Sequence, residues 1–269
     1  MVHVRLPMLT GIDHVIVAVR DLAAAARSVG QLSLAVVEGG AHPDLGTRNL
    51  LSWWGDSYLE LVGVEDSTQA AGSWFGRSAL AALGGPMDGG LVGFALASDD
   101  LAGDVAARDW EGPGFAGLVA GSRTRPDGRR VCWWTARPPG AEAHRPLVFA
   151  IEHDRTAAEW TDSERAARAA AAPADMGRLR LARLELLVPD LAVVSGRLLR
   201  GFDLRFRPSL AGGGARDADV GRQTIRLRRG APGEVSAIVV LRGSVAARSG
   251  GAAQACTVDL PGCRLVLED

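Results

Sequence analysis

Three side chains near the start of the chain have the chemistry of a reaction site: His14, His42 and Glu60. Imidazole nitrogens and carboxylate oxygens transfer protons or ligate divalent metal ions. Glu60 lies between Leu59 and Leu61, in a run that is apolar on both sides. Burying a carboxylate there is costly unless a metal ion, an arginine or a hydrogen-bonding substrate compensates its charge. Glu60 is therefore a candidate functional residue.

The two histidines lie in different predicted settings. His14 belongs to the alternating run Gly11–Val19, which predicts a strand with His14 on one face and Asp13 on the other. An ordinary half-buried strand histidine is the alternative to a ligand or substrate contact there. His42 falls in a predicted loop, and loops on rigid sheets commonly carry binding groups. Its alternative is a purely structural turn over residues 42–47.

The strand that carries His14 begins a β-α-β-β-β unit, and Glu60 lies in the last strand of that unit. The pattern recurs twice. Asp-Leu pairs at Asp21, Asp100 and Asp190 each follow a predicted strand and begin a predicted helix. Their spacings, 79 and 90 residues, are too long for a solenoid and indicate repeated units inside a globular fold.

The position seven residues before each of these aspartates differs among the three units. It is His14 in the first, Gly93 in the second and Arg183 in the third. Glycine has no side chain, and an arginine cannot ligate a metal ion. The second unit does contain a glutamate: Glu152 lies in the predicted strand that corresponds to the one with Glu60.

The repeats divide the chain into three parts. Residues 10–155 hold two units that pair, at 10–66 and 88–155. An alanine-rich linker helix is predicted within 156–177, where Thr161 or Asp162 begins it and Pro173 ends it. Residues 178–269 form a third, divergent unit that glycine-rich loops interrupt.

Composition excludes several classes of function. The formal net charge is −1 and no basic stripe is visible, which argues against a nucleic-acid partner. The chain contains no lysine, so it cannot form a lysine Schiff base. We expect no nucleotide cofactor and no membrane span, because the chain lacks both a phosphate-binding glycine motif and a long apolar run. Cys132, Cys256 and Cys263 fit free thiols in a cytoplasmic protein.

Paired β-α-β-β-β units with a histidine in the first strand and a glutamate in the fourth resemble the vicinal oxygen chelate superfamily. This superfamily includes glyoxalase I, extradiol dioxygenases, epimerases and bleomycin-resistance proteins. The run GGAHPDLGTRNLL followed by YLELVGV is similar to its glyoxalase-like domain group of bacterial proteins. The resemblance implies an α+β fold in which two units form an open, curved-sheet barrel with a cavity, while the third unit is degenerate.

The resemblance also implies a site for a divalent metal ion (Ni, Zn, Mn or Fe) held by His14, Glu60 and Glu152, with water or His42 completing the shell. Gly93 removes one ligand, so the two-histidine, one-carboxylate site of an iron dioxygenase cannot form. The implied activity is that of a lyase or isomerase acting on a small molecule with vicinal oxygens.

Glu60, Glu152 and His42 are the candidate catalytic residues. Candidate substrate contacts are Trp53, Asn49 and Trp133, for which core packing or loop hydrogen bonding is the alternative. A ligand-sequestering protein of the bleomycin-resistance type, without metal or catalysis, is the competing hypothesis. The third unit leaves a homodimer contact open.

Overall fold

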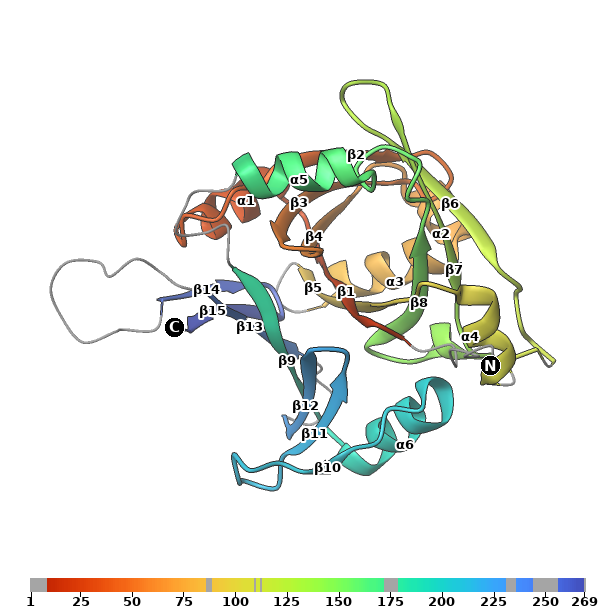
Figure 1. The fold of residues 1–269 in the computed structure, drawn as a ribbon, viewed down its shortest axis with the longest axis vertical. Helices are drawn as coiled ribbons and strands as arrows, with labels where there is room; N and C mark the ends of the chain where they lie inside the picture. Colours follow the sequence, from red (N-terminus) through yellow and green to blue (C-terminus); the bar gives the residue numbers. More distant parts are fainter. Residues whose placement is uncertain are drawn as a thin grey trace, which may run out of the picture.

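The computed structural model describes residues 9–85, 89–108, 110–111, 113–171, 179–230, 236–243 and 256–268. It contains two sheets (Figure 1). The first closes into a barrel with the order β1-β4-β3-β2-β6-β7-β8-β5. Its strands are β1 (Gly11–Val19), β2 (Val37–His42), β3 (Thr47–Trp54), β4 (Ser57–Val64), β5 (Gly89–Ala97), β6 (Val119–Thr124), β7 (Arg130–Ala136) and β8 (Leu147–His153). The α+β class is confirmed, and the barrel is closed where the sequence predicts an open one.

The second sheet has seven strands in the order β10-β11-β12-β9-β13-β15-β14. They are β9 (Arg180–Val188), β10 (Arg207–Pro208), β11 (Arg216–Val220), β12 (Gln223–Arg229), β13 (Ser236–Arg242), β14 (Cys256–Leu260) and β15 (Cys263–Glu268). Helix α6 (Leu191–Phe202) packs against β12. Among the described residues, no helix is long and apolar enough to cross a membrane.

Each predicted Asp-Leu pair begins a helix. The side chains of Asp21, Asp100 and Asp190 accept hydrogen bonds from backbone N–H groups in the first turns of α1 (Leu22–Gly30), α4 (Leu101–Ala107) and α6. Capping by aspartate satisfies donors that have no partner inside the helix. The three repeats therefore share their strand-to-helix junction.

The same register joins the first and last strands of each unit. The residues placed opposite each other are His14 and Tyr58, Gly93 and Leu147, and Arg183 and Thr224. Glu60 lies two residues beyond Tyr58, and Phe149 lies two residues beyond Leu147. The counterpart of Glu60 in the second unit is therefore Phe149, not Glu152 as the sequence suggests.

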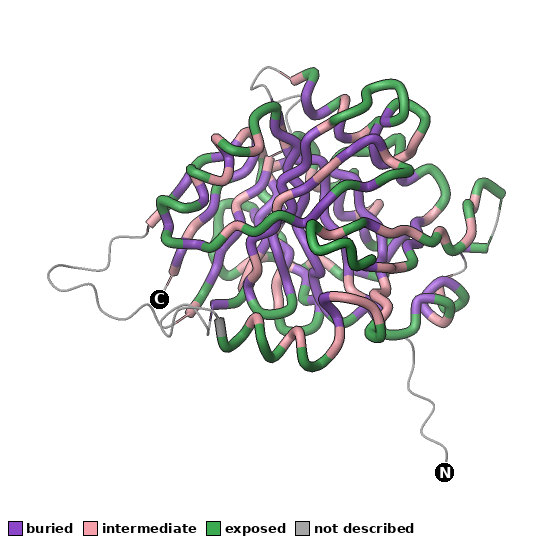
Figure 2. The backbone as a smooth tube through the Cα atoms, turned by 90° about the horizontal axis from the view of Figure 1, so that it is seen from above, coloured by how far each residue is buried: buried purple, intermediate pink, exposed green. Residues whose placement is uncertain are grey.

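The third unit packs against the outside of the barrel. Val15 and Val17 of β1 belong to one buried hydrophobic cluster with Leu184 and Leu186 of β9. Figure 2 shows the buried segments gathered in the middle of the molecule, with exposed segments around them. This shared core fixes the second sheet against the barrel, since burial of apolar surface is the main favourable term in folding.

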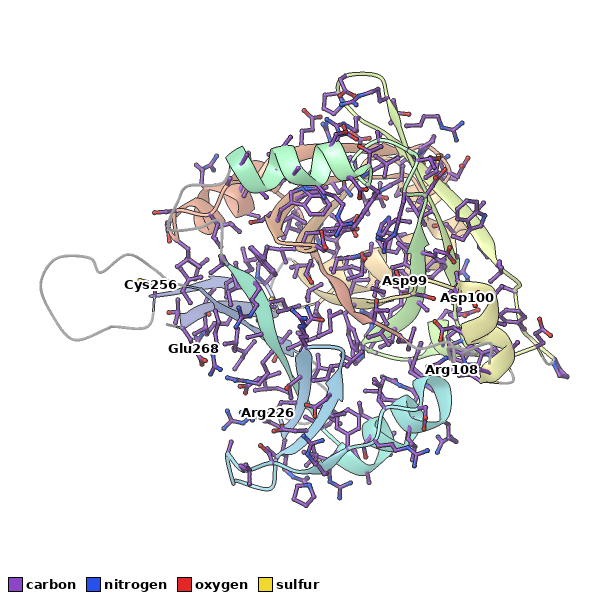
Figure 3. The ribbon with its side chains drawn as sticks, in the orientation of Figure 1. Asp99, Asp100, Arg108, Arg226, Cys256 and Glu268 are labelled. Atoms are coloured by element: carbon purple, nitrogen blue, oxygen red, sulfur yellow. The ribbon has the colours of Figure 1, made fainter. Side chains whose placement is uncertain are left out.

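The other face of the second sheet carries a network of ion pairs. Arg183 Nε lies 2.7 Å from Glu185 Oε1, and Arg183 Nη2 lies 3.3 Å from Glu268 Oε1. Arg226 Nε lies 2.8 Å from Asp217 Oδ1. Figure 3 shows Arg226 and Glu268 on the side of the sheet away from the barrel. Arg183, at the histidine position of the third unit, is thus an ion-pair partner.

Apolar side chains fill both ends of the barrel interior. Helix α3 (Trp74–Leu83), which follows α2 (Ser67–Gly72), places Phe75 in a buried cluster with Ile16 near the later part of β1. At the earlier part of the parallel strand β4, Tyr58 is buried with Trp160. The polar interior lies between these two clusters.

The predicted linker helix corresponds to α5 (Asp162–Ala171), which begins just after Trp160. Figure 1 shows it lying across one end of the barrel. Its predicted end at Pro173 lies outside the described residues.

Gly93 provides a test of the packing between β5 and β8. A Cβ atom at this position would overlap the carbonyl group of Leu147. We expect Gly93→Ala to lower the free energy of unfolding by about 2 kcal/mol or more, because the backbone must move. Gly72→Ala, where a Cβ meets nothing within 4 Å, is the control and should have little effect. Equal denaturation midpoints for the two variants would contradict the close approach.

Candidate functional site

The barrel interior holds a buried Asp-His pair. The register of β1 against β5 shifts between Ile12 and His14, so Asp13 is an extra residue in the strand. Asp13 Oδ1 lies 2.6 Å from His14 Nδ1, and the two residues are 4% and 3% exposed. The bulge therefore brings Asp13 to the side of His14, where simple alternation predicts opposite faces.

A second histidine binds the same carboxylate. His153 Nε2 lies 3.1 Å from each carboxylate oxygen of Asp13, and its ring stacks on Trp160 at a centroid distance of 3.9 Å. Burial would raise the pKa of Asp13, but the His153 charge and the hydrogen bonds from both rings hold that pKa well below its usual value. An ionised Asp13 only accepts hydrogen bonds, so His14 Nδ1 donates and His14 Nε2 faces the interior as the free nitrogen.

Glu60 lies beside this free nitrogen. Its Oε2 is 3.5 Å from His14 Nε2, and its Oε1 accepts a 2.7 Å hydrogen bond from Asn49 Nδ2. Glu60 is only 5% exposed. A separation of 3.5 Å is longer than a good hydrogen bond, so the two groups flank a point where a proton or a ligand atom can be held.

His42 is the last residue of β2 and does not lie in a loop. Gly39 and Gly40 lie inside β2, where Gly40 has a φ of +132° and the register against β3 shifts. His42 Nδ1 lies 2.9 Å from Thr47 Oγ1, and His42 Nε2 lies 3.3 Å from Asn49 Nδ2. Burial lowers the pKa of His42 to about 4, although the charge of Glu60 opposes this shift. The ring is therefore neutral near pH 7.

Aromatic rings wall a cavity of about 50 Å³ around these groups. The Tyr58 ring stacks on His14 at a centroid distance of 4.6 Å, and Phe149 meets His14 edge-on at 5.9 Å. Trp133 meets the His42 ring edge-on at 6.0 Å. Burial and the charges of nearby carboxylates raise the pKa of Tyr58, so it stays protonated. Electrostatic interactions are stronger in such an apolar enclosure than in water.

Charged contacts hold the segment before α5 at the end of the barrel where Tyr58 and Trp160 are buried. Arg123 of β6 forms a buried ion pair with Glu159 and also donates a hydrogen bond to the Gly39 carbonyl. Arg168 of α5 donates to the Glu159 carbonyl, and its guanidinium lies 4.1 Å from the centre of the Trp53 ring. The segment therefore covers this end of the barrel and also connects β8 to α5.

The structure brings together most of the predicted site residues. Those that line the cavity are His14, His42, Asn49, Glu60 and Trp133. Trp53 is not among the lining residues and packs behind Tyr58.

The placement of Glu152 corrects the prediction for that residue. Glu152 Oε2 accepts a 2.8 Å hydrogen bond from the backbone N–H of Leu101, at the start of α4. His153 faces the cavity instead, because adjacent strand residues point to opposite faces.

Several charged residues of the site have no role in the sequence analysis: Arg123, His153 and Glu159 line the cavity, and Asp13 holds His14. The direction of the Asp13 side chain depends on the bulge in β1, which the alternating sequence pattern does not reveal. His153 and Glu152 are adjacent, and the strand phase that separates them follows only from the cavity-facing Phe149 and Ile151. No sequence signal joins Arg123 to Glu159.

The predicted metal site is not assembled. Among the described residues, no group of three or more histidines, cysteines, aspartates or glutamates is arranged to hold a metal ion. Glu152 lies outside the cavity, and the Asn49 amide occupies Glu60 Oε1 and faces His42 Nε2. Of the four predicted ligands, only His14 and Glu60 keep a ligating atom that faces the cavity without a hydrogen bond, His14 Nε2 and Glu60 Oε2, which does not fit a site with three protein ligands.

Asn49 can be used to test this reading. Asn49→Asp replaces the amide donor with a ligand between Glu60 and His42, so divalent-ion affinity should rise by about tenfold or more. Calorimetric titration of the metal-free protein with Zn²⁺, Ni²⁺ and Mn²⁺ measures the change. Asn49→Ala, which adds no ligand, should give a smaller increase. Wild-type protein that binds these ions as tightly as Asn49→Asp would contradict the interpretation.

The pKa of His42 predicts acid sensitivity. Its folded-state pKa of about 4 lies below the ordinary value of 6.5, so the unfolded chain binds more protons between these pH values. The free energy of unfolding is therefore highest above pH 6.5. It decreases by about 3 kcal/mol as the pH falls toward 4. Denaturant unfolding should show that His42→Gln loses less stability over this range than wild type. His144→Gln, at an exposed position, should behave as wild type, and identical profiles for all three would contradict the prediction.

Comparison with known proteins places this chain in a family. Residues 12–202 match the family described as "glyoxalase-like domain". No curated protein matches the chain in sequence. Among solved structures, a hypothetical protein from Staphylococcus aureus is similar over 96% of this chain and 98% of its own, with a TM-score of 0.75 and 15% identity.

Two further solved structures show partial similarity to this chain. A xylose isomerase-like TIM barrel/4-hydroxyphenylpyruvate dioxygenase fusion protein has a TM-score of 0.52 and 17% identity, over 89% of this chain and 37% of its own. Methylmalonyl-CoA epimerase from Mycobacterium tuberculosis has a TM-score of 0.37 and 21% identity, over 56% of this chain and 93% of its own. These likenesses concern the fold alone. The family match spans most of the chain, which therefore belongs to the glyoxalase-like domain family of the vicinal oxygen chelate superfamily.

Proposed function

We propose that this protein is a lyase or isomerase that moves a proton on a small substrate with vicinal oxygen atoms. The observation that carries the proposal is the buried arrangement of Asp13, His14 and Glu60, in which His14 Nδ1 is held by Asp13 and His14 Nε2 faces Glu60. Membership of the glyoxalase-like domain family supports the same class of substrate.

The arrangement gives His14 and Glu60 complementary parts in proton transfer. Asp13 fixes the ring and its tautomer, as a carboxylate does for a catalytic imidazole in other enzymes. His14 Nε2 accepts a proton from substrate carbon or oxygen, and Glu60 Oε2, 3.5 Å away, holds or returns it. Positioned acid–base groups of this kind contribute rate factors of about 10²–10⁴.

The cavity favours a compact, oxygen-bearing substrate. A volume of about 50 Å³ is well below the roughly 300–1,000 Å³ of pockets for drug-sized ligands. Protonated Tyr58 is a hydrogen-bond donor in its wall. Because the interior donors do not fit a three-ligand metal site, no metal-dependent step is part of the proposal.

A ligand-sequestering role without catalysis is the second candidate. It is favoured by the Asn49 amide, which engages Glu60 and His42 together. It is favoured also by the aromatic wall, since stacked and edge-on rings hold planar ligands well.

Proton exchange with solvent tests the proposal directly. Compact 2-oxo acids, 2-hydroxy acids and vicinal diols are incubated with the protein in D₂O, and NMR follows loss of the C–H signal next to the oxygens. We expect exchange with wild type and a decrease of about 10²-fold or more in His14→Gln and Glu60→Gln, because each variant removes a proton carrier.

Glu152→Gln is the matched control, since it makes the same substitution outside the cavity and should retain full exchange activity. Equal loss in Glu60→Gln and Glu152→Gln would contradict the assignment of Glu60. Binding of panel compounds in a thermal-shift assay without any exchange would instead support the sequestering role.

A further inference from the structure

The hairpin between β11 and β12 reaches from the second sheet to the barrel strand that carries the Asp-His pair. Gln223 Oε1 accepts a hydrogen bond from the backbone N–H of Ile12. Gln223 Nε2 donates to Ser57 Oγ at 2.9 Å and lies 3.4 Å from the Ile12 carbonyl oxygen. Ser57 Oγ donates to that same carbonyl at 2.7 Å. The Gln223 amide thus meets both backbone groups of the residue that precedes Asp13.

These backbone groups of Ile12 lack a strand partner on this side. Pairing between β1 and β4 begins only at His14, opposite Tyr58. Asp13 interrupts the ladder with β5 immediately before that point. Unpaired backbone groups are costly when buried, and Ile12 is 2% exposed. The amide of Gln223 supplies one acceptor and one donor, as a peptide group of a neighbouring strand would.

Two glycines allow this close approach, one on each partner. Gly221 has a φ of +57°, and a Cβ there would overlap the Thr10 carbonyl. A Cβ on Gly11 would lie 2.7 Å from Gln223 Oε1. A side chain at Gly221 would push the hairpin away from β1, and one at Gly11 would displace the Gln223 amide.

We propose that Gln223 is a positioning residue of the barrel site. By holding the Ile12 backbone, it fixes the bulge that turns the Asp13 carboxylate toward His14. Without the bulge, strand alternation would point Asp13 to the opposite face and leave His14 Nδ1 without its acceptor. The second sheet then belongs to the functional unit. The inference rests on the proposed function in one respect, because that function makes His14 the proton carrier.

The Nδ1 proton of His14 reports on this positioning. A short hydrogen bond to a carboxylate shifts such a proton to low field in a ¹H NMR spectrum, and its loss in His14→Gln assigns it. Gln223→Met keeps the side-chain length but removes the amide. We expect the low-field resonance to be lost in Gln223→Met while the near-UV circular dichroism of the folded protein is kept. Gln31→Met, the same change at an exposed position, should leave the resonance unchanged.

The outcomes separate this inference from the proposed function. An unchanged His14 resonance in folded Gln223→Met would overturn the positioning role and leave the proposed function intact. Absence of the resonance from wild type would overturn the Asp-His pair and with it the proposed function. If Gln223→Met does not fold, Gln223→Asn replaces it. Its amide is one methylene too short to span the contact, so a retained resonance there overturns the inference in the same way.

Discussion

A buried carboxylate between two imidazole rings is the interaction on which the site depends. Asp13 is charged and almost inaccessible to water, so its charge must be compensated inside the protein. His14 of the first unit and His153 of the second unit provide that compensation. The bulge in β1 places the Asp13 carboxylate beside His14, where its charge is compensated. The ring of Trp160 covers His153 and excludes water from the pair.

The three units use one register for three purposes. The paired first and last strands present His14 and Glu60 in the first unit, where both are buried beside the cavity. The same positions hold Gly93 and Phe149 in the second unit, which supplies close strand packing and an apolar wall. In the third unit they hold arginines, among them Arg183, that form ion pairs on the outer face of the sheet. A repeated backbone has therefore kept its geometry while its side chains have diverged.

Much of the fold could be predicted from local sequence, because Asp-Leu helix starts and strand alternation are short-range signals. The repeated units follow from them, whereas the α+β barrel that holds His14 and Glu60 is what the family resemblance implies. The rest depends on long-range geometry. A bulge reverses the alternation around Asp13, strand phase decides between Glu152 and His153, and His42 ends a strand where a loop is predicted. The metal set implied by resemblance also depends on the Asn49 amide, whose orientation only tertiary contacts fix.

The two covered ends of the barrel have a kinetic consequence. One end is filled by α3 and the other by the segment with Trp160, which Arg123 fastens through Glu159 and which Arg165 fastens through Asp56. Opening of either closure would widen access to the cavity, so these contacts would help to set the rate at which a small molecule enters or leaves. Residence times in this cavity would then depend on the stability of two ion pairs and a ring stack as well as on the ligand's own contacts.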